Sequence, residues 1–386
     1  MVALSPSLDI LDAGASGLSF RCEGDALASA LAIVGRAIPK QASANSSLQG
    51  IRAELEGNTL SLMATDLDLT IRQTLPVAGL GDGVVILPGK IFTDVVKSMP
   101  AGAVEITANG EEVQIEGNRT NFVLRCIPVD EVWGRVAEPV EGEQLVVPAA
   151  QIVTALCQVV PAAATEDSRQ VLLGVLFIAE EEQVSIVATD SYRLAVRSLG
   201  ELSLVKSGQK LLIPARALSE VSRVMADAAS VRVTFGERKA SFEINGVEIT
   251  TQLMQGEFPP FRRLLPNNCS IFVTTDRAEL MEAISRVKLL APTDNMAVKM
   301  DLSEGQAVLK VQGRVEGQGS QTVDVTLEGT DELSIGFNGD YLLAGLHALQ
   351  GEKVRISIVD SSKPCLLHST TDADFTYLCM PVRFNK

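Results

Sequence analysis

The stretch that decides the fold occurs twice along the chain. Residues 60–72 read LSLMATDLDLTIR, and residues 184–197 read VSIVATDSYRLAVR. In both, an apolar alternating run typical of a half-buried strand leads into Ala-Thr-Asp and then into a segment that ends in arginine. The two triplets are 124 residues apart, counted from Asp66 to Asp190. Self-similarity at such a long period predicts a chain built from repeats.

Other segments recur at nearly the same period. The tripeptides ILP at 86–88 and LIP at 212–214 each precede a helical pattern, and SIGFN at 334–338 takes the same place in a third copy. Proline just before a helix costs no hydrogen bond, because the first N–H groups of a helix have no partner inside it. Apolar residues spaced three and four apart predict two helices in each copy. The six apolar stripes are Leu27/Leu31/Val34, Ile91/Val95/Met99, Ile152/Leu156/Val159, Leu218/Val221/Met225, Leu280/Ile284/Val287 and Leu342/Leu346/Leu349.

Between the helices the apolar period changes to two. Residues 231–235 and 242–253 alternate apolar and polar side chains, and the Asn-Gly pair at 245–246 is a favoured hairpin turn. Residues 104–127 and 354–380 show the same alternation. Each copy therefore reads as a helix, several strands, a second helix and more strands, in about 125 residues. The predicted fold class is α+β, with two helices packed on antiparallel sheets in each of three tandem copies.

Two stretches have the composition of boundaries between copies. One is the acidic stretch 138–144, which contains proline and glycine, and the other is Pro-Asn-Asn at 266–268. A length of 386 residues gives each of three domains a core of ordinary size. We therefore expect domains at residues 1–140, 141–266 and 267–386.

Composition places the chain among globular proteins and excludes several other classes. Hydrophobic residues make up 46% and charged residues 21%, which no disordered chain shows. No run approaches the roughly 18–20 apolar residues of a membrane helix, and residues 1–12 lack the basic and apolar regions of a secretory signal, so we expect a cytoplasmic protein. Six cysteines without a CxxC pair predict reduced, buried thiols and no zinc site. An aromatic content of 4% argues against a surface that stacks single-stranded bases.

Enzyme motifs are missing from the sequence. It contains no phosphate-binding glycine loop, no P-loop and no nucleophile elbow, and no cofactor is predicted. His347 and His368 lie in a helical and a strand pattern, where we expect structural roles. Asp66, Asp68 and Asp190 leave one catalytic alternative open, a metal-dependent hydrolase, although their place at strand ends favours turn or capping roles.

The formal charge of −15 is spread unevenly along the chain. The six predicted helices hold eight basic and seven acidic residues, so the acidity is concentrated in strands and loops. If the helices share one surface, that surface is positive relative to the rest and suits sequence-independent contact with a phosphate backbone. Ordinary solvated helix faces are the alternative interpretation of the same count.

Five segments together resemble the bacterial sliding clamp family, the beta subunit of the replicative DNA polymerase III holoenzyme. The resemblance implies a head-to-tail homodimer of three-domain subunits that closes a ring around duplex DNA. It implies a processivity factor and not an enzyme, which tethers the replicative polymerase subunit, the clamp loader and repair or translesion polymerases through their short linear peptide motifs. The segments follow the family's order and span all three copies: residues 64–67, 188–196, 258–266, 335–338 and 380–383.

The resemblance also implies where the partners bind. A peptide-binding pocket would lie between the second and third domains, with apolar members that receive hydrophobic side chains and with Arg193 at the wall. The pocket residues carried over by motif are Leu172, Thr189, Ser191, Tyr192, Arg193, Leu194, Pro259, Arg263, Leu264, Asn338, Tyr341, Leu378, Met380, Val382 and Arg383. The DNA contacts would be Arg36, Lys40, Arg72, Arg169 and Arg197, and the dimer contacts would be Phe122 and Leu124 of the first domain against Leu289 and Leu290 of the third.

Two departures from the family's pattern bear on these expectations. Residues 129–133 replace a turn that contains proline and an aromatic residue, so we expect this edge to pack differently. Ser191 and Tyr192 stand at pocket positions where other members carry different residues, and we expect a shifted peptide preference. A specialised paralogue that keeps the ring and the pocket, for example to sequester an inhibitor, is the alternative to the replicative clamp.

Overall fold

The computed structural model describes residues 17–40, 46–136, 138–166, 169–180, 183–200, 202, 204–206, 208–291, 296–312 and 317–383. Residues 1–12, considered above for a signal sequence, lie outside the described residues. The chain divides into two compact units: unit 1 takes Met1–Val147 and Asp227–Gln252, and unit 2 takes Pro148–Ala226 and Leu253–Lys386. Among the described helices, none combines the length and the apolar character needed to cross a membrane.

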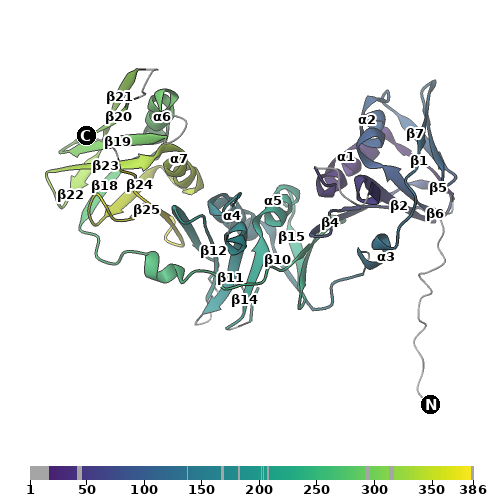
Figure 1. The fold of residues 1–386 in the computed structure, drawn as a ribbon, viewed down its shortest axis with the longest axis horizontal. Helices are drawn as coiled ribbons and strands as arrows, with labels where there is room; N and C mark the ends of the chain where they lie inside the picture. The colour runs from purple at the N-terminus through teal and green to yellow at the C-terminus, as the bar shows by residue number, and fades with distance from the viewer. Residues whose placement is uncertain are drawn as a thin grey trace, which may run out of the picture. The chain divides into compact units, whose positions relative to one another are not determined.

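Each copy of the repeat contains the two helices predicted from its apolar stripes. They are α1 (Gly24–Val34), α2 (Gly89–Ser98), α4 (Ala149–Val159), α5 (Ala215–Val224), α6 (Arg277–Val287) and α7 (Gly339–Ala348). The helices of a copy pack side by side, α1 with α2, α4 with α5 and α6 with α7 (Figure 1). Pro88 and Pro214 directly precede α2 and α5, as predicted. Asp276 and Asn338 instead cap α6 and α7, because their side chains accept hydrogen bonds from backbone N–H groups of the first turn.

Unit 1 contains two antiparallel sheets within the described residues. The hairpin predicted at Asn245-Gly246 is confirmed: both residues have positive φ, 49° and 80°, as a two-residue primed turn requires. The five-stranded sheet has, in spatial order, β5 (Ala78–Gly81), β1 (Leu18–Glu23), β7 (Ala103–Ala108), β8 (Glu112–Gly117) and β9 (Thr120–Arg125). The eight-stranded sheet has β10 (Glu143–Pro148), β15 (Ser230–Phe235), β16 (Lys239–Ile244), β17 (Val247–Gln252), β4 (Leu69–Pro76), β3 (Thr59–Thr65), β2 (Gly50–Glu56) and β6 (Gly83–Pro88).

Unit 2 also has two antiparallel sheets in the part of the chain that the structure describes. The larger has, in spatial order, β14 (Lys210–Pro214), β11 (Gly174–Glu180), β12 (Gln183–Thr189), β13 (Arg193–Ser198), β26 (Phe375–Cys379), β25 (Cys365–Ser369), β24 (Lys353–Ile358), β18 (Ile271–Asp276) and β22 (Thr326–Glu328). The smaller has β21 (Gln318–Asp324), β20 (Gln306–Gln312), β19 (Ala297–Ser303) and β23 (Glu332–Asn338).

The sheet order shows how one copy of the repeat joins the next. In unit 1, strands β2-β3-β4 of the first copy continue into β17-β16-β15 of the second through the β4–β17 pair. In unit 2, strands β11-β12-β13 continue into β26-β25-β24 of the third copy through the β13–β26 pair. The corresponding strands left over are β9 and β21, and each is the outer strand of its sheet within the described residues. We call such a pair of strands from consecutive copies a strand joint. The chain therefore contains two strand joints, β4–β17 and β13–β26, and the strands β21 and β9 that would form a third.

Equivalent aromatic residues anchor the segments that connect the copies. Trp133 lies in the short helix α3 (Val132–Val136) and packs on Met63 and Ile86. In unit 2, Phe261 belongs to a core cluster that includes the matching residues Val187 and Leu212. The edge at 129–133, which departs from the family's sequence pattern, is thus held by a tryptophan that is only 2% exposed.

The six cysteines are free thiols, but the prediction that they are buried holds only in part. Cys365 and Cys379 are buried in facing positions of β25 and β26, where burial raises the thiol pKa of each. Cys157 is exposed, so the prediction is wrong there. Its neighbours Leu156 and Val159 occupy the buried stripe of α4, and a residue directly beside such a stripe can face solvent.

A charge network on the smaller sheet of unit 2 predicts a pH-dependent stability. Burial alone would raise the pKa of Asp301, but hydrogen bonds from Lys299, Lys310 and Ser334 lower that pKa to about 2. The carboxylate therefore stabilises the fold above its ordinary pKa of 3.8, and this contribution is lost as the pH falls toward 2.

We expect Asp301→Asn to lower the free energy of unfolding of this region by about 1 kcal/mol at pH 7, after allowance for solvent screening. Urea unfolding followed by circular dichroism at pH 7 and at pH 3 measures the difference. The gap between variant and wild type should shrink at the lower pH, and a gap of equal size at both pH values would contradict the assignment.

Candidate functional site: a side-chain cluster around Arg193 and Tyr341

The repeated Ala-Thr-Asp sequence builds a tight turn at the edge of the unit 2 sheet. The Thr189 hydroxyl donates to the Arg193 carbonyl (2.6 Å) and accepts from the Ser191 N–H (3.1 Å). The Asp190 carboxylate accepts from the N–H groups of Tyr192 and Arg193, both at 2.9 Å. These bonds hold Ser191 at φ 79°, a left-handed conformation that few non-glycine residues adopt. The turn thereby presents the side chains of Tyr192 and Arg193.

The first copy of the repeat forms the same turn with the same bonds. Thr65 donates to the Leu69 carbonyl (3.1 Å), and Asp66 accepts from the N–H groups of Asp68 and Leu69. Leu67 takes the left-handed position at φ 81°. The predicted turn role is confirmed for Asp66 and Asp190, whereas the Asp68 side chain accepts no such bond from the described residues. Among the described residues no group of three or more His, Cys, Asp or Glu side chains is placed to hold a metal ion, so the geometry offers nothing for the hydrolase alternative.

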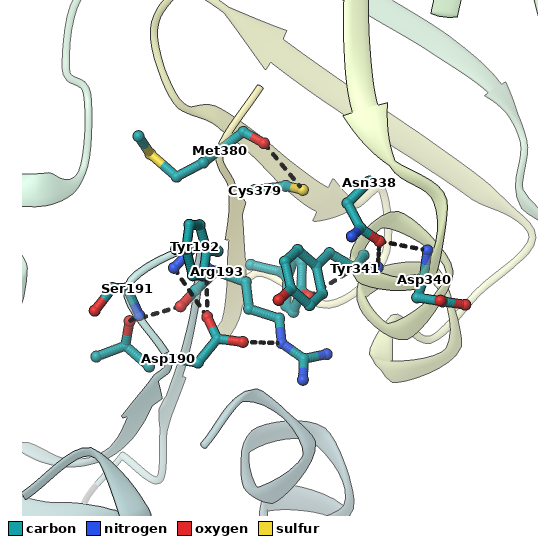
Figure 2. A network of polar contacts seen from close by, with 11 residues as sticks. Asp190, Ser191, Tyr192, Arg193, Asn338, Asp340, Tyr341, Cys379 and Met380 are labelled. Atoms are coloured by element: carbon teal, nitrogen blue, oxygen red, sulfur yellow. Dashed lines mark hydrogen bonds and ion pairs between the residues drawn. The ribbon is translucent and has the colours of Figure 1, made fainter. Parts of the chain in front are cut away.

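Arg193 is the centre of a polar and aromatic cluster, drawn in Figure 2. Its guanidinium pairs with the Asp190 carboxylate (2.9 Å) and lies 4.7 Å from the ring centre of Tyr341. The Tyr192 ring stacks on the Tyr341 ring with centroids 6.0 Å apart and an interplanar angle of 21°. Burial opposes the charge on Arg193, but the nearby Tyr377 and Asp190 outweigh it and raise the guanidinium pKa. The cation is therefore held in place beside the Tyr341 ring.

Tertiary hydrogen bonds fix the other side of this cluster. Asn338 caps α7 and so places Tyr341 in its first turn, while the Tyr377 hydroxyl donates to the Tyr341 carbonyl (2.8 Å). The Met380 N–H donates to the Tyr192 carbonyl (2.8 Å), which brings the chain end beside the Ala-Thr-Asp turn. Burial raises the pKa of the Tyr341 hydroxyl, and Asp190 raises it further, so this ring stays neutral at physiological pH.

An apolar floor lies below the cluster. Leu194 and Leu378 face each other across the β13–β26 joint and belong to a buried cluster, against which Met380 packs. Leu172 and Thr189 are also buried. Two of the predicted pocket residues, Tyr192 and Leu264, keep exposed fractions of 60% and 46%.

The structure places every predicted pocket residue in unit 2. Ser191, Tyr192, Arg193, Asn338, Tyr341 and Met380 meet in the cluster of Figure 2, and Thr189 is hydrogen-bonded within the same turn. Pro259 and Val382 are half-buried, and Arg263 and Arg383 are exposed. Sequence reasoning missed two members. Asp190 was not predicted to belong to the pocket, although it pairs with Arg193, and the sole signal for Tyr377 was its place in an alternating strand next to Leu378.

Comparison with known proteins identifies the family. Models of the DNA polymerase III beta subunit match the chain at residues 18–133 (N-terminal domain), 146–260 (central domain) and 262–383 (C-terminal domain). The chain belongs to the DNA polymerase III beta subunit family. As a member of this family of sliding clamps it is a non-catalytic processivity factor of DNA replication.

Individual relatives agree with this assignment along nearly the whole clamp. The beta sliding clamp of Streptomyces coelicolor is 30% identical over 380 residues, which cover 95% of this chain and 100% of that protein. The beta sliding clamp of Staphylococcus aureus strain Mu50 is 27% identical, with coverage of 87% and 92%. The crystal structure of a sliding clamp from Pseudomonas aeruginosa bound to griselimycin has a TM-score of 0.85 and 25% identity, and covers 96% of this clamp and 100% of that chain.

The arginines and the lysine predicted to contact DNA fall into two groups. Arg36 and Lys40 are exposed near the end of α1. Arg72 lies 3.6 Å from Glu248, Arg197 pairs with Asp372 at 2.5 Å, and Arg169 donates a hydrogen bond to the Ser191 hydroxyl. Arg72 and Arg197 thus have a carboxylate of the clamp beside them, and the side chains of Arg36 and Lys40 are exposed.

The residues predicted at the dimer contact lie in β9 and in the short helix before β19, one of whose residues borders β21. Phe122 and Leu124 are in β9, and Phe122 is 37% exposed. Leu289 and Leu290 follow α6 in a short helix, Lys288–Leu290, and Leu289 is 81% exposed. Leu290 borders β21, since a Cβ built on Gly319 would lie 3.1 Å from its side chain.

Proposed function

We propose that this clamp acts as a head-to-tail homodimeric ring in the cytoplasm, which encircles duplex DNA without sequence preference and slides along it. In that ring it tethers the replicative polymerase subunit, the clamp loader and repair or translesion polymerases, whose short linear peptides dock in the Arg193 pocket. The observation that carries the proposal is the strand joint, which occurs twice within the chain. The strands that would form a third joint, β9 and β21, are each the outer strand of a sheet within the described residues.

Closure by a second copy follows from that pattern. The β4–β17 and β13–β26 joints both link the fourth strand of one copy to the last strand of the next. By the same rule β21 would pair with β9 of another chain, and Leu289 would cover Phe122. A head-to-tail interface of this kind either closes a ring or grows a filament. Two chains with three copies each supply six similar joints, and the family's dimer supports the closed form.

The pocket has the composition expected for capturing a short peptide. Leu194, Leu378 and Met380 offer an apolar floor to aliphatic or aromatic side chains, and the Arg193 guanidinium can meet a carboxylate or a carbonyl. A cyclic or linear ligand would replace water over the exposed Tyr192 ring, which is favourable. A related clamp, that of Pseudomonas aeruginosa, is bound to griselimycin, which supports a ligand site on the fold.

The three-domain division at residues 1–140, 141–266 and 267–386 is also a proposal. The family matches at 18–133, 146–260 and 262–383 support it to within a few residues. Both strand joints then fall between domains, β4–β17 between the first and second and β13–β26 between the second and third.

Retention on circular DNA tests the proposed ring. The labelled clamp, loaded by its clamp loader onto a nicked circular plasmid, should co-elute with the DNA in gel filtration and should dissociate when the plasmid is cut at one site. A ring held by topology is lost from DNA ends, whereas a clamp held by tight phosphate contacts stays bound. Equal retention on circular and linear DNA would overturn the proposal.

Charge reversal of Arg36 and Lys40 should weaken the sliding contacts. Both side chains are exposed and carry positive charge near the end of α1. We expect Arg36→Glu with Lys40→Glu to reduce the amount of clamp retained on circular DNA about threefold to tenfold at low salt, and less at higher salt because exposed charges are screened. The matched control is Arg238→Glu with Lys239→Glu, which reverses neighbouring charges on the edge of the β16 hairpin. Equal loss in both variants would mean that only net charge matters.

A further inference from the structure

Unit 1 contains a cavity at the matching place in the first strand joint. It has a volume of about 510 Å³ and opens between the Ala-Thr-Asp turn of the first copy, the end of β17 and the segment after α3. Volumes of roughly 300–1,000 Å³ are usual for ligand clefts. Leu67 and Asp68 from the turn, Thr250 and Gln252 from β17, and Val136 from α3 are among its lining residues.

The backbone around the cavity has the same hydrogen bonds and turn conformation as the backbone around the Arg193 pocket. The Gln252 N–H donates to the Asp68 carbonyl (3.0 Å), and the Met380 N–H donates to the Tyr192 carbonyl (2.8 Å). Leu67 matches Ser191, with φ 81° and 79°. Val136 follows the anchor Trp133 by three residues, as Leu264 follows Phe261. The cavity is therefore the repeat counterpart of the pocket and not an unrelated surface hollow.

Four matched positions of the two sites differ in chemistry. They carry apolar or aromatic side chains in unit 2 and polar side chains in unit 1. The residues are Tyr192, Leu194, Leu378 and Met380 in the pocket, and Asp68, Thr70, Thr250 and Gln252 in the cavity. A ligand that fits the pocket by burying apolar side chains gains little from the cavity, because it would leave these polar groups without partners.

Three charged side chains around the cavity have no partner among the described residues. Asp68, Glu138 and Lys239 line it, and none of them forms an ion pair or a side-chain hydrogen bond with the part of the chain that the structure describes. The two carboxylates outnumber the single ammonium group. The threonine hydroxyls and the Gln252 amide add acceptors and donors beside them.

We propose that this cavity is a second docking site, which takes a short extended peptide with basic side chains. A lysine or arginine of the ligand would pair with Asp68 and Glu138, and the exposed Leu67 and the half-buried Val136 would contact an aliphatic neighbour. The choice of a peptide rests on the proposed function of the Arg193 pocket, whereas the preference for basic residues rests on the lining of the cavity itself.

The single tryptophan makes the site observable in the intact clamp. Trp133 lies in α3, whose Val136 lines the cavity, and no other tryptophan occurs in the chain. Titration with the peptide acetyl-Lys-Leu-Lys-amide should change Trp133 emission in a saturable way, while acetyl-Glu-Leu-Glu-amide should produce no saturable change. Absence of a saturable change with the basic peptide would overturn the proposal.

Variants that remove charges distinguish binding of the basic peptide at this cavity from its nonspecific attraction to an acidic protein. Asp68→Asn with Glu138→Gln keeps the side-chain volumes and should weaken binding of the basic peptide about tenfold. Glu105→Gln with Glu111→Gln removes two exposed charges of unit 1 away from the cavity and should leave the dissociation constant unchanged. Equal weakening by both pairs would overturn the proposal.

A third variant distinguishes this site from the pocket. Arg193→Ala with Met380→Ala should leave the Trp133 titration unchanged. If those changes have no effect on griselimycin binding while the Trp133 response persists, the assignment of the pocket fails and the cavity stands. If they abolish the Trp133 response, the basic peptide binds at the pocket and the cavity proposal fails.

Discussion

Leu289→Asp should convert the clamp from a dimer to a monomer. Leu289 is 81% exposed in the single chain, so the substitution removes no contact that the fold needs. At the proposed joint it would place a carboxylate against the apolar Phe122 of another copy. An apolar anchor at the centre of an interface is worth about 2–4 kcal/mol, and a buried unpaired charge adds to the loss. We therefore expect the dimer to weaken at least about a thousandfold.

Sedimentation equilibrium at micromolar concentration measures this change. The wild type should sediment at twice the chain mass of 41.1 kDa and the variant at the chain mass. Leu80→Asp is the matched control, because Leu80 is 61% exposed in β5, at the other edge of the sheet that ends in β9. A dimeric Leu289→Asp variant, or a monomeric wild type, would show that the seam lies elsewhere or that no ring forms.

Arg193→Ala with Met380→Ala should abolish most peptide binding while the dimer persists. The first change removes the cation beside Tyr341 and leaves the Asp190 carboxylate, whose side chain is 11% exposed, without its ion-pair partner. The second removes a side chain that packs on the apolar floor. Two central contacts of this kind together account for about 3 kcal/mol, so the dissociation constant of griselimycin, used as the probe, should rise about a hundredfold.

Isothermal titration calorimetry with griselimycin measures the loss, and sedimentation confirms the dimer. Arg355→Ala is the matched control, because Arg355 also pairs with a carboxylate, Glu328, and lies 4.3 Å from the ring centre of Phe272. That variant should bind as the wild type does. Unchanged affinity in the Arg193→Ala and Met380→Ala double variant would place the ligand site outside the Arg193 cluster.

Much of the local structure could be predicted from sequence because local rules decide it. The six helices follow from apolar residues three and four apart, and Pro88 and Pro214 mark the starts of two of them. The Asn245-Gly246 hairpin follows from the positive φ angles that such a turn needs. The turn at Asp66 and Asp190 follows from the short reach of an aspartate to its own backbone. All of these interactions join residues within about one helical turn or one hairpin.

Interactions between distant segments could not be predicted in the same way. That Arg197 pairs with Asp372 depends on β13 lying beside β26, and the exposure of Cys157 depends on which side of α4 other elements cover. The sequence did not distinguish the apolar pocket from its polar counterpart in unit 1, since both start from Ala-Thr-Asp.

The sequence by itself therefore determined the repeat, the elements of each copy and the family of clamps to which the chain belongs. Only the tertiary structure decided that Arg193 pairs with Asp190 beside Tyr341, and that Asp68 and Glu138 line one cavity with Lys239. The physical reason is the range of the interactions. Periodicity and turns depend on neighbours along the chain, whereas the partners of a charge or a ring depend on strand pairing between segments far apart in sequence.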